Sequence, residues 1–407
     1  MFASRNTLTP EQRQYLLVTA NYWAFTLTDG ALRMLVVLYF HQLGYAPLAI
    51  AMLFLFYEFF GVVTNLVGGW LGARIGLNRT MNIGMGLQIL ALGMLLAPAA
   101  WLTVPWVMAA QALSGIAKDL NKMSAKSAIK TLVPKEGRDE KLFKYIALLT
   151  GSKNALKGVG FFVGGALLSL LGFTGAVAIL LLLLAVIWLG GLSGLKQELG
   201  KAKNKPKFKD IFSKSRNINI LSAARLFLFA ARDVWFVVAL PVYLAVQFGW
   251  DHWQVGSFLA LWIIGYGLVQ TLAPHITRRS ARTPGGLEAV LWVSLLMFTP
   301  AIIALGLDWG LYWLLAGLLL FGVLFAINSS LHSFLIVHYA DEDGVSLDVG
   351  FYYMANAAGR LFGTLLSGAL FQQWGLTACL WVSAAMLLLT MLISLGLPGR
   401  LAGHSPS

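Results

Sequence analysis

The 407-residue sequence has few charged side chains and almost no cysteine. Asp, Glu, Lys and Arg make up 12% of the chain, and hydrophobic residues make up 58%. A soluble domain is about a quarter charged, so the scarcity of charge excludes that class and indicates a membrane protein. The single cysteine, Cys379, excludes an intramolecular disulfide framework.

Motifs for catalysis and metal binding are missing as well. The sequence has no nucleophile elbow and no metal-ligand spacing, and its six histidines form no coordinating set. These absences argue against an enzyme, and we expect no catalytic residues, no cofactor and no metal. Acidic residues are also few. The 17 Asp and Glu stand against 30 Lys and Arg, for a formal net charge of +13.

The apolar residues form twelve runs, each long enough to cross a bilayer. A helix needs about 20 apolar residues to span ~30 Å of hydrocarbon. Ahead of the first run, Thr9, Pro10 and Gln12 form a capping sequence that predicts a helix start. We therefore predict an all-α integral membrane protein of twelve transmembrane helices. The expected spans are 15–41, 46–71, 80–98, 103–132, 143–171, 174–195, 218–246, 253–274, 286–306, 309–336, 349–373 and 376–397.

Basic residues gather in the loops on one side of these spans. Loops expected on the outer side, such as "QLGYA" and "QFGWDHW", contain no Lys or Arg, whereas the opposite loops are rich in both. This positive-inside pattern predicts that both termini are cytosolic. Because the charge is a topology signal, we expect no nucleic-acid partner. We expect the central basic run, from Lys196 to Arg216, to contact anionic lipid headgroups.

One long polar run divides the chain. It extends from Lys196 to Arg216 and contains eight basic and two acidic residues. We predict an N-terminal six-helix bundle over 1–195, a basic cytosolic central loop over 196–217 and a C-terminal six-helix bundle over 218–407.

The two halves share an internal repeat. At an offset of 203 residues, "KGVGFFVGGALLSLLGF" lies on "RLFGTLLSGALFQQWGL", so that Gly160 meets Gly363 and Gly172 meets Gly375. Internal duplication of this kind is typical of secondary transporters. The repeat therefore predicts that the two six-helix bundles are pseudo-symmetric.

Charged side chains also lie within the spans. Only thirteen residues of the seventh span follow Asp233, too few to cross ~30 Å of hydrocarbon, so Arg232 lies inside the membrane. Nine cations and four carboxylates are placed within the spans in this way, which leaves five positive charges without an acidic partner. They are Arg33, Lys118, Lys122, Lys126, Lys153, Lys157, Arg225, Arg232 and Arg360, against Asp29, Glu58, Asp119 and Asp233.

Four lysines recur at every fourth position: Lys118, Lys122, Lys126 and Lys130. On a helix they lie within about a third of the circumference, opposite a face of mostly small residues. Each Lys or Arg facing lipid at a helix centre costs roughly 2.5–3.5 kcal/mol, so these side chains must face a watery interior. The spacing predicts a helix that lines a cavity and whose lower end emerges in the cytosol. The alternative is a fourth span that ends at Ala117, followed by an amphipathic cytosolic connection from Lys118 to Lys144.

The surplus of positive charge favours a multivalent anion as the transported substrate. Arginine forks bind phosphate-like oxygens in a bidentate way, and lysines add point charge. The residues expected to bind the substrate are Arg33, Lys118, Lys122, Lys126, Lys153, Lys157, Arg232 and Arg360. The residues expected to couple transport to protons or to balance charge are Asp29, Glu58, Asp119 and Asp233.

The loop after the second span, "GGWLGARIGLNRT", resembles the signature of the major facilitator superfamily. That signature is a Gly-x-Leu-x-Asp-Arg-x-Gly pattern between helices two and three, and Gly69, Leu71, Arg74 and Gly76 match it. Ala73 stands at the acidic position, so the family's gate latch lacks its carboxylate here. The resemblance implies a pathway lined by helices one, four, seven and ten. It also implies a gating role for Gly69, Arg74, Gly76 and, in the matching loop of the second half, Arg278.

Longer segments resemble a narrower branch, the ArsJ-type organoarsenical efflux permeases. They are "NYWAFTLTDGALRMLVVLYFHQLGY", "LFLFYEFFGVVTNLVGGWLGARIGLNRTM" and "KDLNKMSAKSAIKTLVP". The resemblance implies export of 1-arseno-3-phosphoglycerate from a bacterial cell across its inner membrane. It also implies a functional partner, the glyceraldehyde-phosphate dehydrogenase that forms this compound from arsenate.

Two other transport functions remain open from the residues themselves. An organophosphate–phosphate exchanger would use the same arginines, and a lipid-headgroup flippase would need a cavity open sideways to lipid. The coupling ion, proton or anion, is also open. An anionic substrate already favours exit under an inside-negative potential.

Overall fold

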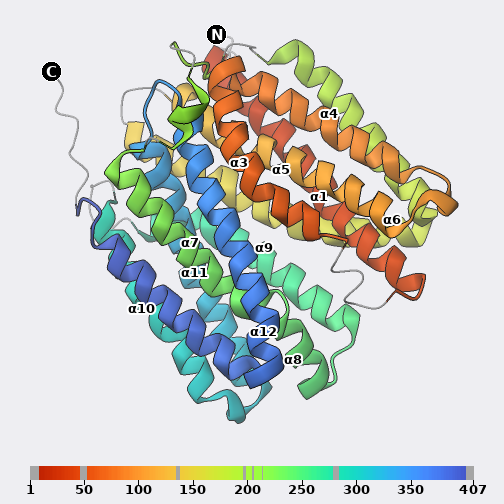
Figure 1. Cartoon of the computed structure of the whole chain (residues 1–407), viewed down its shortest axis with the longest axis vertical. Coiled ribbons are helices and arrows are strands. Elements are labelled where there is room, and N and C mark those ends of the chain that lie inside the picture. Colours follow the sequence, from red (N-terminus) through yellow and green to blue (C-terminus); the bar gives the residue numbers. More distant parts are fainter. Residues whose placement is uncertain are drawn as a thin grey trace, which may run out of the picture.

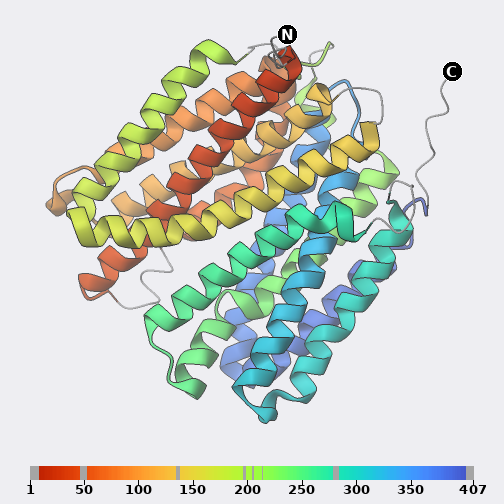
Figure 2. The same cartoon turned by 180° about the vertical axis from the view of Figure 1, so that it is seen from behind.

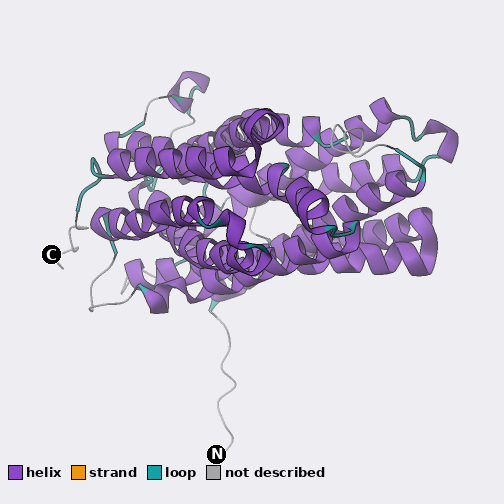
Figure 3. Ribbon diagram, turned by 90° about the horizontal axis from the view of Figure 1, so that it is seen from below, coloured by secondary structure: helices purple, strands orange, loops and turns teal. Residues whose placement is uncertain are grey.

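The computed structural model describes residues 9–45, 53–133, 138–195, 199–203, 206–212, 214–277 and 284–399. Within these residues every regular element is a helix, as Figure 3 shows. Short 3₁₀ turns at Ala99–Trp101, Phe208–Ile211 and Leu307–Trp309 join some of the α-helices. The α-helices are α1 (Pro10–Gln42), α3 (Leu55–Ile75), α4 (Leu77–Leu95), α5 (Val104–Leu132), α6 (Arg138–Gly194), α7 (Arg216–Phe236), α8 (Ala239–Phe248), α9 (His252–Ile276), α10 (Gly286–Leu305), α11 (Leu311–Tyr339) and α12 (Val345–Ser394).

These helices make the twelve membrane spans expected from the sequence. The long helices α6 and α12 each contain two spans, and α7 and α8 together make one span of 33 residues. Residues 46–52, with which the second expected span begins, lie outside the described residues. At the N-terminal start of α1, Thr9 accepts a hydrogen bond from the Gln12 backbone N–H and closes a capping box, as the sequence predicts.

The internal repeat appears in the structure as two equivalent kinks. Gly172 interrupts α6 with φ 68°, and Gly375 interrupts α12 with φ 72°. Glycine suits both points because a side chain is disfavoured at positive φ. Gly160 and Gly363 are also equivalent: a Cβ on either would lie 2.7 Å from a carbonyl oxygen, of Leu27 in α1 or of Ala230 in α7.

The spans form two bundles, one from α1 to α6 and one from α7 to α12. Figures 1 and 2 show the bundles close together at the end where α1 and α12 begin, and diverging toward the opposite end. The distribution of basic residues assigns the end where they meet to the cytosol. The bundles therefore meet at the end that the positive-inside pattern assigns to the cytosol.

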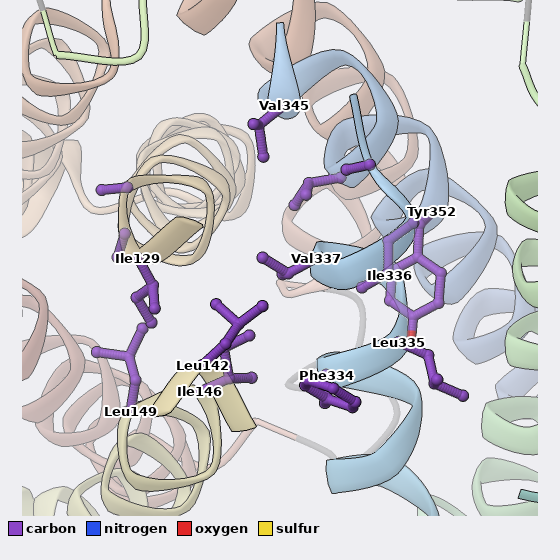
Figure 4. Close-up of a cluster of buried hydrophobic side chains, with 14 of the residues drawn as sticks. Ile129, Leu142, Ile146, Leu149, Phe334, Leu335, Ile336, Val337, Val345 and Tyr352 are labelled. Atoms are coloured by element: carbon purple, nitrogen blue, oxygen red, sulfur yellow. The ribbon is translucent and has the colours of Figure 1, made fainter. Parts of the chain in front are cut away.

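A cluster of buried apolar side chains joins the bundles at this cytosolic end. It contains Ile129 of α5 and Leu142 of α6 from one bundle, and Phe334 of α11 and Val345 of α12 from the other (Figure 4). The rings of Phe143 and Phe334 lie 4.9 Å apart across the junction. Full burial of a side chain of this size stabilises by about 1.5–3 kcal/mol, so the cluster holds the cytosolic end closed.

Candidate functional site

Ten charged side chains gather midway along the bundles and are here named the central charge cluster. Ion pairs connect eight of them, and the pair of Asp29 and Lys157 is joined to these through Tyr57. Two of its carboxylates come from α1 and α3, one from α5 and one from α7. The cations come from these helices and from α6 and α12. The members are Asp29, Glu58, Asp119 and Asp233 with Arg33, Lys118, Lys122, Lys157, Arg232 and Arg360.

Glu58 of α3 lies at the centre of this network. Its Oε1 atom is 3.5 Å from Arg33 Nη1 and 3.1 Å from Arg360 Nη2, and its Oε2 atom is 4.0 Å from Lys118 Nζ. Arg360 belongs to the opposite bundle, and its Nε atom is 3.2 Å from Asp233 Oδ2. A chain of ion pairs therefore crosses between the bundles in the middle of the membrane.

The internal repeat extends to two of the ion pairs. In the first bundle Lys157 of α6 lies 3.9 Å from Asp29 of α1, and in the second Arg360 of α12 lies 3.2 Å from Asp233 of α7. Lys157 and Arg360 are 203 residues apart, the offset of the glycine repeat. Each bundle thus joins its first and fifth spans by a cation and a carboxylate at equivalent places.

The upper part of the lysine ladder also belongs to the cluster. Lys122 Nζ is 2.5 Å from Asp119 Oδ1, and Lys118 Nζ is 3.8 Å from Asp119 Oδ2. Lys118 lies 3.8 Å from the centre of the Tyr57 ring, whose hydroxyl donates to Asp29 at 2.9 Å. Cation–π contact of this kind stabilises a partly desolvated ammonium by roughly 1 kcal/mol.

The cluster is enclosed by protein, but its middle is not fully sealed. The side chains of Arg33 and Arg360 are each 28% exposed, and that of Glu58 is 24% exposed. Charged groups tolerate burial in a membrane protein when they pair with one another or meet water. The arrangement is therefore that of an interior polar site between the two bundles.

Two expected substrate-binding residues lie apart from this network. Lys126 and Lys153, like Arg225, have no carboxylate within 4.0 Å among the residues that the structure describes. The four carboxylates are instead shared among six other cations. The nine interior cations predicted from the sequence therefore exceed the four interior carboxylates by five.

The lower end of the lysine ladder is more buried than expected. The sequence predicts that it emerges in the cytosol, but Lys126 is 3% exposed and donates a hydrogen bond to the Tyr353 hydroxyl of the opposite bundle. Lys130, also buried, donates to the carbonyl oxygens of His338 and Ala340. These lysines are covered because the bundles close around this end of α5, which one helix alone does not reveal.

The expected gating loop lies at the cytosolic junction. Gly69 packs so closely against α12 that a Cβ would lie 2.4 Å from the Ser346 carbonyl oxygen. Gly76, with φ 101°, separates α3 from α4, and the Arg74 guanidinium lies 5.1 Å from the centre of the Trp70 ring. Arg278 lies outside the described residues. The gating role itself stays a prediction.

Sequence reasoning missed the neutral groups that hold the cations. Tyr57, Tyr353 and Asn356 all bind interior charges, and Asn356 Oδ1 accepts from Arg225 Nε at 2.8 Å. Tyrosine and asparagine in apolar spans are ordinary packing residues by composition. The only local signal was the position of Tyr57, directly before Glu58.

The chain belongs to the Major Facilitator Superfamily, because that family's sequence pattern matches residues 16–285 and again 221–406. It is therefore a multi-pass membrane transporter. No curated protein sequence gives a significant match. The finer ArsJ-type relationship remains a resemblance of the quoted segments.

Solved structures of this fold are similar over almost the whole chain. The human organic anion transporter MFSD10 (TETRAN) is 17% identical with a TM-score of 0.76, and covers 95% of this chain and 100% of its own. The transporter FucP in the outward conformation is 11% identical with a TM-score of 0.73, over 93% and 97%. A bacterial homologue of the iron transporter ferroportin, in an outward-facing state, is 17% identical with a TM-score of 0.72, over 95% and 99%. At these identities the likeness establishes the fold alone.

Proposed function

We propose that this chain is a secondary transporter that exports an organic anion by alternating access. The observation that carries the proposal is the charge balance of the predicted interior set, in which nine cations stand against four carboxylates that are all already paired. A neutral or cationic cargo would leave five positive charges uncompensated. An anionic cargo with more than one charge supplies the missing neutralisation.

The chemistry of the cations favours phosphate-like groups. Arg33, Arg232 and Arg360 present planar forks that match tetrahedral oxyanions, and the lysines add charge without a fixed geometry. Export is favoured because an anion leaving the cell moves down an inside-negative potential. The likeness to an organic anion transporter, at 17% identity, supports the fold and not the cargo.

The particular substrate we propose is 1-arseno-3-phosphoglycerate, which comes from the resemblance to ArsJ-type permeases. It has a phosphate at one end and an acyl arsenate at the other, in keeping with an extended interior field of positive charge. A glyceraldehyde-phosphate dehydrogenase would be the functional partner that forms it. The bacterial inner membrane would be the location.

The interior carboxylates have two candidate roles in this cycle. Glu58, Asp29, Asp119 and Asp233 all contact cations, which supports charge balance in the absence of cargo. Any of them that is released from its cations by an arriving anion becomes free to take up a proton. Proton coupling is therefore part of the proposal, and charge balance is the role that the contacts favour.

Uptake into everted membrane vesicles tests the cargo. Vesicles with the protein receive arsenate together with the dehydrogenase, its nicotinamide cofactor and its triose phosphate, or arsenate alone. Arsenic should accumulate only with the complete mixture, and the Arg360→Gln variant should abolish this accumulation. Equal accumulation from arsenate alone would refute the arsenylated cargo.

A second candidate function is organophosphate–phosphate exchange, favoured by the same arginine side chains. Exchange predicts that inorganic phosphate on the far side of the membrane accelerates uptake of a phosphorylated acid. Uniport or proton-coupled export predicts no such acceleration. Preloading the vesicles with phosphate distinguishes the two mechanisms in the same assay.

A further inference from the structure

Three interior cations without carboxylate partners lie at a common depth, here named the cytosolic cation triad: Lys126 of α5, Lys153 of α6 and Arg225 of α7. Lys126 and Lys153 stand four residues to the cytosolic side of Lys122 and Lys157. At 1.5 Å per residue this separation is about 6 Å, and the seven residues from Arg225 to Arg232 span about 10 Å. The triad therefore forms a layer below the central charge cluster.

The contacts of Lys126 and Arg225 satisfy hydrogen bonds but leave the charges unbalanced. Lys126 donates to the Tyr353 hydroxyl and lies 4.6 Å from the centre of its ring. Arg225 donates from Nε to Asn356 Oδ1 at 2.8 Å and from Nη1 to the Ser329 carbonyl oxygen at 3.2 Å. Neutral acceptors stabilise a buried cation less than a carboxylate does.

Lys153 is held in the same way and lies near the other two. Its ammonium is 3.3 Å from Asn154 Oδ1, and Asn154 in turn donates to Gln270 of the opposite bundle at 2.5 Å. Lys126 and Arg225 are held by Tyr353 and Asn356, which lie one turn apart on α12, so these two cations are neighbours. Lys153 lies four residues to the cytosolic side of Lys157, as Lys126 does of Lys122, so all three positive charges belong to the same layer.

Three interior cations without a carboxylate partner are unfavourable by themselves. Lys126 is 3% exposed and Arg225 is 2% exposed, so water does little to screen them. Uncompensated buried charges cost several kcal/mol each, and an oxyanion between them would remove most of that cost. The central charge cluster, with six cations and four carboxylates, has a surplus of two, whereas the triad has three cations and no carboxylate.

We propose that Lys126, Lys153 and Arg225 form a second anion subsite, which binds one end of a two-ended anion while the arginines of the central charge cluster bind the other. This inference rests on the proposed function and adds to it which side chains bind the second anionic end of the cargo. A three-carbon chain with phosphate-like groups at both ends separates its charges by roughly 6–8 Å, from bond lengths of about 1.4 Å. That span fits the separation of the two layers.

The test compares two probes that differ mainly in one charged end. 3-Phosphoglycerate has a phosphate and a carboxylate on a three-carbon chain, and glycerol 3-phosphate has the phosphate alone. Binding of both is measured by calorimetry on the purified full-length protein and on K126Q, K153Q, R225Q and the surface control K144Q. Each triad variant should bind 3-phosphoglycerate about 10-fold to 100-fold more weakly, as loss of a charge-assisted hydrogen bond predicts. Binding of glycerol 3-phosphate should change little, which also shows that the variants are folded.

The possible results distinguish the second anion subsite from the proposed transport function. If the unchanged protein prefers 3-phosphoglycerate but all three triad variants keep that preference, the subsite is refuted and the transport of phosphorylated anions stands. If the unchanged protein binds both probes equally, a second subsite is refuted as well. If it binds neither, both the subsite and the proposed function fail. Should one variant not fold, the other two positions still decide the question.

Discussion

The two bundles carry their interior charge on different side chains. The first bundle supplies five lysines and one arginine, whereas the second supplies three arginines and no lysine. The fourth span of the first bundle, α5, has its lysine ladder, but the fourth span of the second, α11, has aromatic and hydroxyl groups at the same spacing. These are Phe321, Phe325, Ser329 and Ser333, all buried.

The two kinds of cation give the two bundles different binding properties. Lysine ammonium groups are compact and strongly hydrated, so the first bundle provides a flexible field of positive charge. Guanidinium groups are planar and weakly hydrated, so the second bundle provides fixed binding directions. A pseudo-symmetric backbone thus supports an electrostatically asymmetric interior.

The largest effect is expected where the two halves are joined. Arg360→Gln removes the contacts to Glu58 and Asp233 and leaves two carboxylates short of a cation. Breaking a buried ion pair in this way destabilises on the order of 3 kcal/mol. We expect a clear fall in the thermal unfolding temperature in detergent and no transport in vesicles. K144Q, in an exposed pair with Glu140, is the matched control. Unchanged stability would show that the bridge has no structural role.

Exchanging the two kinds of cation should affect the halves unequally. Arg232 contacts Asp233 Oδ1 through both Nε and Nη2, at 2.6 and 2.5 Å, and a lysine cannot reproduce this fork. We expect Arg232→Lys to lower transport about 10-fold, as loss of one charge-assisted hydrogen bond predicts. Lys122→Arg should retain its pair with Asp119 and most of the transport activity. Equal losses of transport activity in both variants would contradict this difference between the bundles.

Substitution of either kink glycine should lower the stability by the same amount, because the two kinks are equivalent positions of the internal repeat. Gly172→Ala and Gly375→Ala place a side chain at positive φ, where neither glycine has a neighbouring atom within 4 Å of the added Cβ. Backbone strain alone therefore predicts a loss of about 1–3 kcal/mol for each. Thermal unfolding of the two variants measures it, and a large difference between them would mean that the kinks are not equivalent.

The smallest expected effect is a gain in stability. Lys126→Gln removes a buried charge that has no carboxylate partner and keeps a donor for the Tyr353 hydroxyl. The ligand-free protein should become more stable by ~1 kcal/mol, since replacing a poorly compensated buried charge is neutral or stabilising. Thermal unfolding without substrate measures the change. A loss of stability as large as that of Arg360→Gln would show that Lys126 is balanced after all.

Local rules of sequence account for most of the fold. Apolar runs set the twelve spans, Thr9 and Pro10 set the first helix start, and the boundaries expected between two pairs of spans coincide with the kinks at Gly172 and Gly375. Each of these depends on a few neighbouring residues and on the thickness of the bilayer.

The interior of the site was predictable in composition but not in its contacts. The excess of cations follows from counting, yet the pairing of Glu58 with Arg360 joins residues 302 positions apart. The contact of Lys126 with Tyr353 likewise depends on how the two bundles dock. Contacts across the bundle interface are set by packing of whole helices, which no single segment encodes.

The Glu58–Arg360 bridge has a consequence for the idle carrier. Under the proposed function, Glu58 occupies the Arg360 guanidinium that an incoming oxyanion would bind, and small inorganic anions would have to outcompete it. A transporter fastened in this way would resist leaking chloride or phosphate down the membrane potential. A ligand would then need enough charge to displace Glu58 before the joint between the two halves loosens.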